Sequence, residues 1–157
     1  MTTGHQIIGC GNLNRGDDAA GLLVVRRLHE LGIPADEESG EALSLIESWK
    51  DSEAVILIDA VVTGAQPGTI KFWDTESTGT FPANVAKSTS THGFGVAQAV
   101  ELARNLDCLP PKLVIYGIEG SRFEIGTTPS PRVLAMVEKL AQQIAIEWNT
   151  GGGGEAA

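Results

Sequence analysis

The stretch AVILID, residues 54–59, is an unbroken apolar run that ends in one carboxylate, Asp59. A strand shows such a run when helices cover both faces of its sheet, because neither side of the strand then meets water. The run therefore predicts a central strand of a parallel sheet. Ligands of open α/β sheets bind at the carboxyl ends of the strands, so Asp59 also marks an edge where a site is expected.

Helical and extended patterns alternate along the rest of the chain, as they do in α/β proteins. Further strands are expected at residues 5–8, at 112–120, and as one short segment within 33–40. Four helices are expected, and each has apolar residues at helical spacing. The predicted buried faces are Ala20, Val24, Leu28 and Leu31; Ala42, Leu45, Ile46 and Trp49; Val96, Ala99, Val100 and Ala103; and Leu134, Val137, Ala141, Ile144 and Trp148.

The stretch TIKFWD, residues 69–74, predicts another strand, and the connection before it indicates its direction. Residues 60–69 are too few for the helical crossover that parallel neighbours require, so this strand should run antiparallel. We therefore expect one α/β domain over residues 1–149, in three layers, with a mostly parallel sheet, one antiparallel strand and helices on both faces. The Gly-rich end, residues 150–157, is expected to be a disordered tail.

The charge of the chain limits its partners. Its formal net charge is −9, and nucleic acid is therefore not expected as a partner, because binding to phosphates depends on Lys and Arg. No apolar run approaches the roughly 18 to 20 residues of a membrane span, so no membrane insertion is expected. The start, MTTGHQIIG, lacks a basic stretch followed by a long apolar core, which predicts a cytoplasmic protein. An acidic chain favours a cationic substrate or a metal centre.

The motif GCGNLNRGDDAAG, residues 9–21, resembles a phosphate-binding loop but carries the wrong charge. Gly11 and Gly16 have the spacing of the P-loop, yet Asp17 and Asp18 stand where that loop has a Lys and a hydroxyl. The dinucleotide pattern fails as well, because Asn14 replaces its third glycine. Nucleotide binding is thus disfavoured by both charge and spacing.

The two aspartates of this motif lie where a helix should begin. Aspartate is favoured as an N-cap, and this is the interpretation we adopt for Asp17. Two adjacent residues cannot both be the cap, so Asp18 is free to point into a cleft. Asp18, Asp59 and His92, which follows the long irregular stretch 75–91, can all converge on one edge of the sheet. Two carboxylates and an imidazole suit a divalent metal such as zinc, nickel or manganese, although capping roles for His92 and Asp59 are the alternative.

Three stretches together resemble the hydrogenase maturation proteases. They are GCGNLNRGDDAAG, which is similar to the opening motif of that family; LIDAV, which contains Asp59; and STHGFG, which contains His92. The resemblance extends over nearly the whole chain up to the tail. It implies a twisted sheet with helices on both faces, and it implies that Asp18, Asp59 and His92 are the metal-contacting residues.

The resemblance also implies an activity. Members of this family are endopeptidases that remove the C-terminal extension of the nickel-loaded large-subunit precursor of [NiFe] hydrogenases. The metal would then be the nickel of the substrate, and no tightly held cofactor is expected. Two alternatives stay open: a module that recognises or delivers nickel without cutting, and a related peptidase that acts on another precursor.

Three further residues bear on the site. Cys10 lies between two glycines, and a buried small apolar residue is the expected role rather than a nucleophile. Glu119 ends a predicted strand and is a weaker candidate for substrate binding, with a solvated rim carboxylate as the alternative. Glu38 is a second weak candidate, because many relatives carry Asp-Gly-Gly-Thr where this chain has ESGE, residues 38–41. This departure bears on partner specificity rather than on the reaction.

Overall fold

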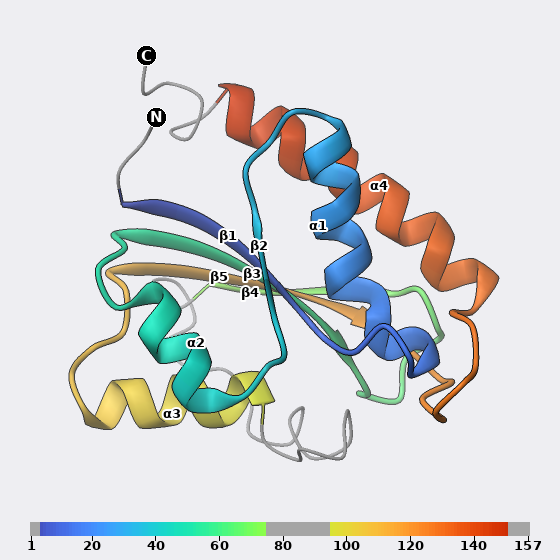
Figure 1. Cartoon of the computed structure of the whole chain (residues 1–157), viewed down its shortest axis with the longest axis horizontal. Helices are drawn as coiled ribbons and strands as arrows, with labels where there is room; N and C mark the ends of the chain where they lie inside the picture. Colours follow the sequence, from blue (N-terminus) through green and yellow to red (C-terminus); the bar gives the residue numbers. More distant parts are fainter. Residues whose placement is uncertain (1–3, 75–94, 151–157) are drawn as a thin grey trace.

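A computed structural model describes residues 4–74 and 95–150 of the chain (Figure 1). They form one α/β domain around a five-stranded sheet with the order β2-β1-β3-β5-β4. The strands are β1 (His5–Cys10), β2 (Asp36–Glu38), β3 (Ala54–Val61), β4 (Ile70–Asp74) and β5 (Lys112–Glu119). Strands β1, β2, β3 and β5 are parallel, whereas β4 runs antiparallel to β5. The predicted mixed sheet and its one antiparallel strand are confirmed.

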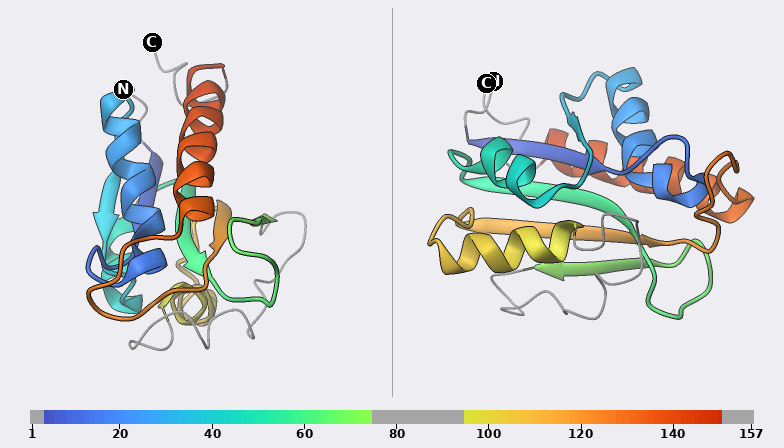
Figure 2. Two further views of the ribbon diagram at one scale, coloured as in Figure 1. Left: turned by 90° about the vertical axis from the view of Figure 1, so that its right-hand side faces the viewer. Right: turned by 60° about the horizontal axis from the view of Figure 1, so that its bottom comes forward.

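Helices cover both faces of this sheet (Figures 1 and 2). They are α1 (Ala20–Glu30), α2 (Ala42–Trp49), α3 (Gly95–Asn105) and α4 (Pro131–Thr150), and a short 3-10 helix, η1 (Gly16–Ala19), precedes α1. The pair α1 and α4 packs on one face, and the pair α2 and α3 packs on the other. The three layers expected from the sequence are therefore present. Within the described residues, no helix is long and apolar enough to cross a membrane.

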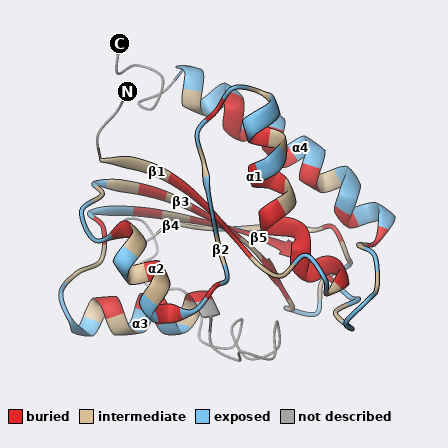
Figure 3. Cartoon of the chain, viewed as in Figure 1, coloured by how far each residue is buried: buried red, intermediate tan, exposed pale blue. Residues whose placement is uncertain are grey.

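The core is divided in two by the sheet, because successive side chains of a strand point to opposite faces. On β3, Leu57 packs towards α2 and α3, whereas Ile58 packs towards α1 and α4. Both residues are fully buried, which explains the unbroken apolar run in the sequence. On the helices, the buried residues lie on the sides that face the sheet (Figure 3). Trp49 of α2 is the largest of the fully buried side chains.

The predicted face of the last helix is wrong at its first position. Leu134 is 46% exposed, whereas the preceding residue, Val133, is fully buried. Val133 begins a stripe at spacings of four and three residues, through Val137 and Leu140 to Ile144, and Leu134 lies beside that stripe. The predicted end of the domain also differs slightly, since α4 continues to Thr150. The remainder of the predicted tail lies outside the described residues.

Candidate functional site at the carboxyl edge of the sheet

The strand order creates a switch point between β1 and β3. The chain leaves β1 through α1 on one face of the sheet to form β2, and it returns through α2 on the other face to form β3. Ligands of open α/β sheets bind in the crevice that such a divergence leaves at the carboxyl ends of the strands. The last paired residues of β1 and β3 are Gly9 and Ile58, so Cys10 and Asp59 follow them side by side at this edge.

The glycines of the motif allow α1 and the loop before it to lie directly against the sheet. A Cβ atom on Gly21 would overlap the carbonyl oxygens of Cys10 and Ile58, and one on Gly9 would overlap the carbonyl oxygen of Gly21. Gly11 has a φ of +148°, and a Cβ there would overlap the carbonyl oxygen of Asp18. The motif is therefore a packing device that brings Asp18 close to the end of β1.

Asp18 lies in η1 and is only 4% exposed. Its backbone carbonyl accepts a hydrogen bond from the amide of Asn12 at 3.1 Å, which holds the turn closed. Burial raises the pKa of its side chain to about 7, against the opposing effect of the nearby Arg15 charge. A carboxyl group with such a pKa is partly protonated at neutral pH, and a bound cation would favour its charged form.

Asp59 lies at the carboxyl end of β3 on the face of α2 and α3. Its Oδ1 accepts a hydrogen bond from the backbone amide of Ala60 at 2.8 Å. Burial raises the pKa of Asp59 well above its ordinary value, and the charge of Asp18 raises it further. The two predicted site carboxylates are therefore close enough to repel each other. Charged together, they would be stabilised by a cation between them.

The thiol of Cys10 lies near both of these carboxylates and near a third, that of Glu38. Its side chain is fully buried, as the sequence predicted, and burial raises the pKa of its thiol well above the ordinary value. The charges of Asp59, Glu38 and Asp18 raise the pKa further, in that order. Glu38 pairs with Cys10 in the register of β2 and β1, so this weak candidate does lie near the predicted site. A thiol in such surroundings is a poor nucleophile.

The third predicted metal contact, His92, lies outside the described residues, as does the stretch 75–91 that precedes it. Among the residues that are described, no group of three or more His, Cys, Asp and Glu side chains is arranged to hold a metal ion. The described part of the site is thus a pair of carboxylates, Asp18 and Asp59, with Glu38 nearby.

Asp17 does not cap a helix, which corrects the prediction. Neither η1 nor α1 has a side-chain N-cap hydrogen bond. Instead, the fully buried carboxylate of Asp17 accepts hydrogen bonds from the amides of Ser121 (2.8 Å) and Arg122 (3.0 Å). It accepts two more from Ser130, from the amide at 2.6 Å and from the hydroxyl at 2.8 Å. Burial alone would raise the pKa of Asp17, but these hydrogen bonds outweigh burial and lower it.

These bonds fasten the motif loop, residues 11–18, to a second loop, residues 120–130, which we call the flanking loop. The two loops lie side by side at one end of the sheet (Figure 1). Three backbone hydrogen bonds also join them, from Gly16 to Thr127 (3.0 Å), from Asp17 to Arg122 (2.6 Å) and from Gly126 to Asn14 (2.7 Å). No local sequence signal predicts this connection, because its partners lie more than 100 residues apart.

Glu119 is 2% exposed and braces a different loop, so it is not the solvated rim carboxylate considered as the alternative. Its carboxylate accepts hydrogen bonds from the amide and hydroxyl of Thr63, at 2.9 and 2.6 Å, and from the amide of Gly64 at 3.2 Å. These hydrogen bonds stabilise the buried charge of Glu119, so a structural role explains its burial. Contact of Glu119 with a substrate stays a prediction.

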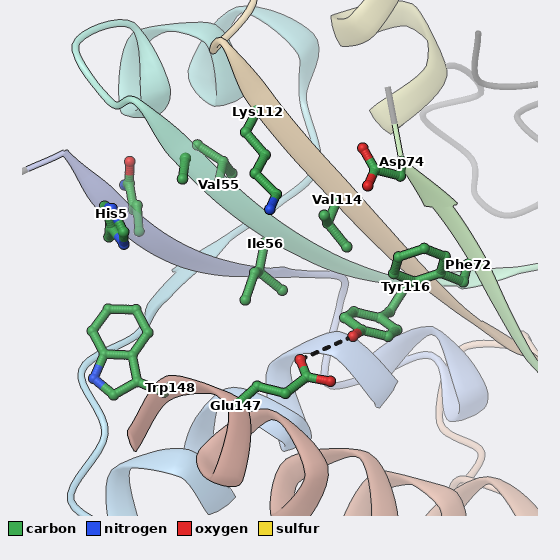
Figure 4. A pocket seen from close by; sticks show the side chains of 12 residues that line it. His5, Val55, Ile56, Phe72, Asp74, Lys112, Val114, Tyr116, Glu147 and Trp148 are labelled. Carbon is green, nitrogen blue, oxygen red and sulfur yellow. Dashed lines mark hydrogen bonds between the residues drawn. The ribbon is translucent and has the colours of Figure 1, made fainter. Parts of the chain in front are cut away.

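A cavity of about 390 Å³ lies at the opposite, amino-terminal edge of the parallel strands (Figure 4). It is bounded by the start of β3, by Lys112 at the start of β5 and by Glu147 and Trp148 near the end of α4. The hydroxyl of Tyr116 donates a hydrogen bond to Glu147 at 3.2 Å, and burial followed by the charge of Glu147 raises the pKa of Tyr116 to about 12. None of the predicted site residues that the structure describes lines this cavity.

Comparison with known proteins gives consistent matches. Residues 39–147 match the family model described as hydrogenase maturation protease. The chain is 29% identical over 146 residues to the hydrogenase 2 maturation protease of Escherichia coli, an alignment that covers 88% of this chain and 86% of that one. The matched family region contains Asp59 and His92 and begins after Asp18.

Solved structures give the same picture. The hydrogenase maturating endopeptidase HybD from Escherichia coli superposes with a TM-score of 0.73 at 22% identity, over 94% of this chain and 93% of that one. The [NiFe] hydrogenase maturation protease HycI from Thermococcus kodakarensis superposes with a TM-score of 0.66 at 28% identity, over 92% and 91% of the two chains. The likeness to HybD shows the shared fold.

Proposed function

Because the chain belongs to the hydrogenase maturation protease family, we propose that it is the endopeptidase that removes the C-terminal extension of a nickel-loaded [NiFe] hydrogenase large-subunit precursor. The family membership supports a hydrolase that cleaves a peptide bond during hydrogenase maturation. The nickel of the precursor is the element that this chain recognises, and Asp18, Asp59 and His92 are the residues that contact it.

The observation that supports this proposal is the pair of carboxylates at the switch point. Burial raises the pKa of both Asp18 and Asp59, and the charge of Asp18 raises the pKa of Asp59 further. A divalent cation placed between them would neutralise both charges and lower both pKa values. A nickel ion carried by the substrate fits this role, because carboxylate and imidazole groups bind nickel and the pair lies at an open edge of the sheet.

In the proposed reaction, water adds to the carbonyl carbon at the cleavage site, and the amine of the departing peptide takes up a proton. Nickel can assist by polarising the carbonyl or by lowering the pKa of the attacking water. The contribution of Asp18 and Asp59 is to place the bond next to the nickel.

The intact mass of a large-subunit precursor tests the proposal. The precursor is incubated with the protein after loading with nickel, and in parallel without nickel. Loss of a C-terminal peptide from the loaded form alone supports a nickel-dependent endopeptidase. Asp18→Ala, Asp59→Ala and His92→Ala should each abolish the cleavage while the circular dichroism spectrum stays that of a folded protein. Cleavage at the normal rate by one of these variants would remove that residue from the site.

A folded wild-type protein that binds the loaded precursor without cutting it would contradict the peptidase proposal. That result would instead support the nickel-recognition module. Cleavage that is equally fast with and without nickel would retain the peptidase and refute the role of the metal.

A further inference from the structure

Two exposed apolar side chains lie on the fastened loops next to the site. Leu13 belongs to the motif loop and is 39% exposed, and Ile125 belongs to the flanking loop and is 75% exposed. The backbone hydrogen bond between Gly126 and Asn14 joins the residues that follow them, so the two side chains stand on adjacent turns. Single exposed apolar residues are ordinary, but two on adjacent turns at a site edge form a surface that a partner can cover.

The loops are held firmly, so the exposure of these residues is a property of the fold. The buried carboxylate of Asp17 accepts four hydrogen bonds that fasten the flanking loop, in addition to the three backbone bonds. Within the flanking loop, Phe123 packs against the core under α1 and α4, whereas Ile125 points to solvent. A surface that is rigid before binding loses little conformational entropy when it binds.

Cationic side chains border the same turns, although the chain carries a net charge of −9. Arg15 is half-buried, and its Nε is buried without a hydrogen-bond partner among the described residues. Arg122 is exposed, and one of its terminal nitrogens donates only a long hydrogen bond, of 3.3 Å, to the carbonyl of Thr128. Arginine is frequent in protein interfaces, where its guanidinium group binds carboxylates.

We propose that Leu13, Arg15, Arg122 and Ile125 form the docking surface for the hydrogenase precursor, and that this surface accepts an apolar segment bordered by carboxylates. The inference rests on the proposed function, since the occupant is the protein whose bond is cut. The surface is continuous with the motif loop that carries Asp18, so a chain docked there reaches the carboxylate pair. In this proposal Leu13, Arg122 and Ile125 contribute to binding alone, whereas Arg15 also lies close enough to Asp18 for its charge to lower the pKa of that carboxyl.

Docking and cleavage make different kinetic predictions. Loss of a contact that is equally strong in the bound substrate and in the transition state raises KM and leaves kcat unchanged. Ile125→Ser and Leu13→Ser should each raise KM about tenfold, the size of effect typical of an important interface residue. Arg122→Glu should raise KM as well, and its effect should shrink with added salt because screening weakens exposed charge interactions.

Matched controls come from the opposite edge of the sheet. Ile146 on α4 is 62% exposed and Leu106 after α3 is 60% exposed, and both lie near the ends of their helices, far from the motif loop. Ile146→Ser and Leu106→Ser should leave both KM and kcat at the wild-type values. If the removal of any exposed apolar side chain had this effect, Ile146→Ser and Leu106→Ser would raise KM as much as Ile125→Ser does. That result would overturn the inference.

A binding experiment separates this inference from the proposed function. Calorimetry with the nickel-loaded precursor and an Asp18→Asn background, chosen to slow cleavage, should show about tenfold weaker binding when Ile125→Ser is added, and unchanged binding when Ile146→Ser is added. If the wild-type protein cleaves the precursor but Ile125→Ser and Leu13→Ser keep the wild-type KM, the docking surface is refuted and the function stands. If the wild-type protein leaves the precursor intact, the function itself is refuted.

Discussion

The carboxylate of Asp17 accepts hydrogen bonds from both the backbone amide and the hydroxyl of Ser130, at 2.6 and 2.8 Å, although 113 residues separate them. Ser130 immediately precedes α4, so this contact joins the beginning of the first helical segment to the beginning of the last. It also decides which of two adjacent aspartates is available for chemistry. The carboxylate of Asp17 is used in hydrogen bonds that hold the fold together, so Asp18 is the aspartate that remains for the candidate site.

Replacing Asp17 should therefore cost much of the stability of the domain. Asp17→Ala leaves three backbone amides and one hydroxyl without their acceptor, and we expect a loss of about 3 kcal/mol in the free energy of unfolding. Ser130→Ala removes only the hydroxyl bond and should cost about 1.5 kcal/mol. Urea denaturation followed by circular dichroism measures both changes. A loss below about 1 kcal/mol for Asp17→Ala would show that the donors find other partners.

The same carboxylate should make stability depend on acid pH. The pKa of Asp17 is lower in the folded protein than in the unfolded chain, so the unfolded chain binds more protons at acid pH. The stabilisation by Asp17 is fully present above the unfolded pKa of about 4 and is lost as the pH falls through the folded value. The difference in stability between the wild type and Asp17→Asn should thus narrow as the pH falls below about 5. A difference in stability that stays constant with pH would contradict the lowered pKa of Asp17.

Asp18 should show the opposite sign. Its pKa is raised to about 7, so the folded protein binds more protons than the unfolded chain between about pH 4 and pH 7, and stability falls as the pH rises through that range. At pH 8, Asp18→Asn should therefore be more stable than the wild type, by on the order of 1–2 kcal/mol. Thermal melts from pH 4 to pH 8 test this, and a variant that is less stable at pH 8 would refute it.

The thiol of Cys10 should be unreactive and should take no part in cleavage. Burial and three neighbouring carboxylates raise the pKa of its thiol, whereas Cys108 is only half-buried. In the native protein at pH 8, iodoacetamide should modify Cys108 well before Cys10, as peptide mapping by mass spectrometry would show. Cys10→Ala should cleave the precursor at the normal rate and lose about 1 kcal/mol of stability. Loss of cleavage by a folded Cys10→Ala variant would reopen its role as a nucleophile.

Gly21 should be among the least replaceable residues. Gly21→Ala would place a methyl group on the carbonyl oxygens of Cys10 and Ile58, so α1 must move away from the sheet. We expect a loss of about 3 kcal/mol or more, because well-packed cores do not accept added volume. Gly32→Ala is the control: nothing lies within 4 Å of its Cβ position, and only its positive φ of +81° opposes the change. Thermal unfolding compares the two variants, and similar melting temperatures would contradict the packing account.

Much of the fold could be predicted because it depends on local patterns. The apolar run at β3 and the short connection before β4 were sufficient to predict a buried central strand and an antiparallel neighbour. The predicted face of α4 is wrong at Leu134 because Val133 and Leu134 are both apolar and either can begin the face that contains Val137 and Ile144. Only contact with the sheet selects between the two.

The proximity of the two candidate carboxylates could be predicted, but the structure that supports them could not. Asp18 follows β1 and Asp59 lies near the carboxyl end of β3, and parallel strands end at a common edge, so their proximity could be expected from the sequence. The neighbourhood of Cys10 and Glu38 required the register of β1 with β2, which no local pattern contains. His92 lies outside the described residues, and its place in the site stays a prediction.

The sequence by itself thus determined the class of fold, the edge that carries the carboxylates and the family to which the chain is similar, because each depends on residue types and short spacings. The tertiary structure alone decided that Asp17 fastens the flanking loop, that Glu119 braces a loop, and that Leu13 and Ile125 stand exposed beside the site. The physical reason is that hydrogen bonds and burial depend on groups brought together from distant parts of the chain. The same side chain can therefore serve structure or chemistry, according to the partners that folding places beside it.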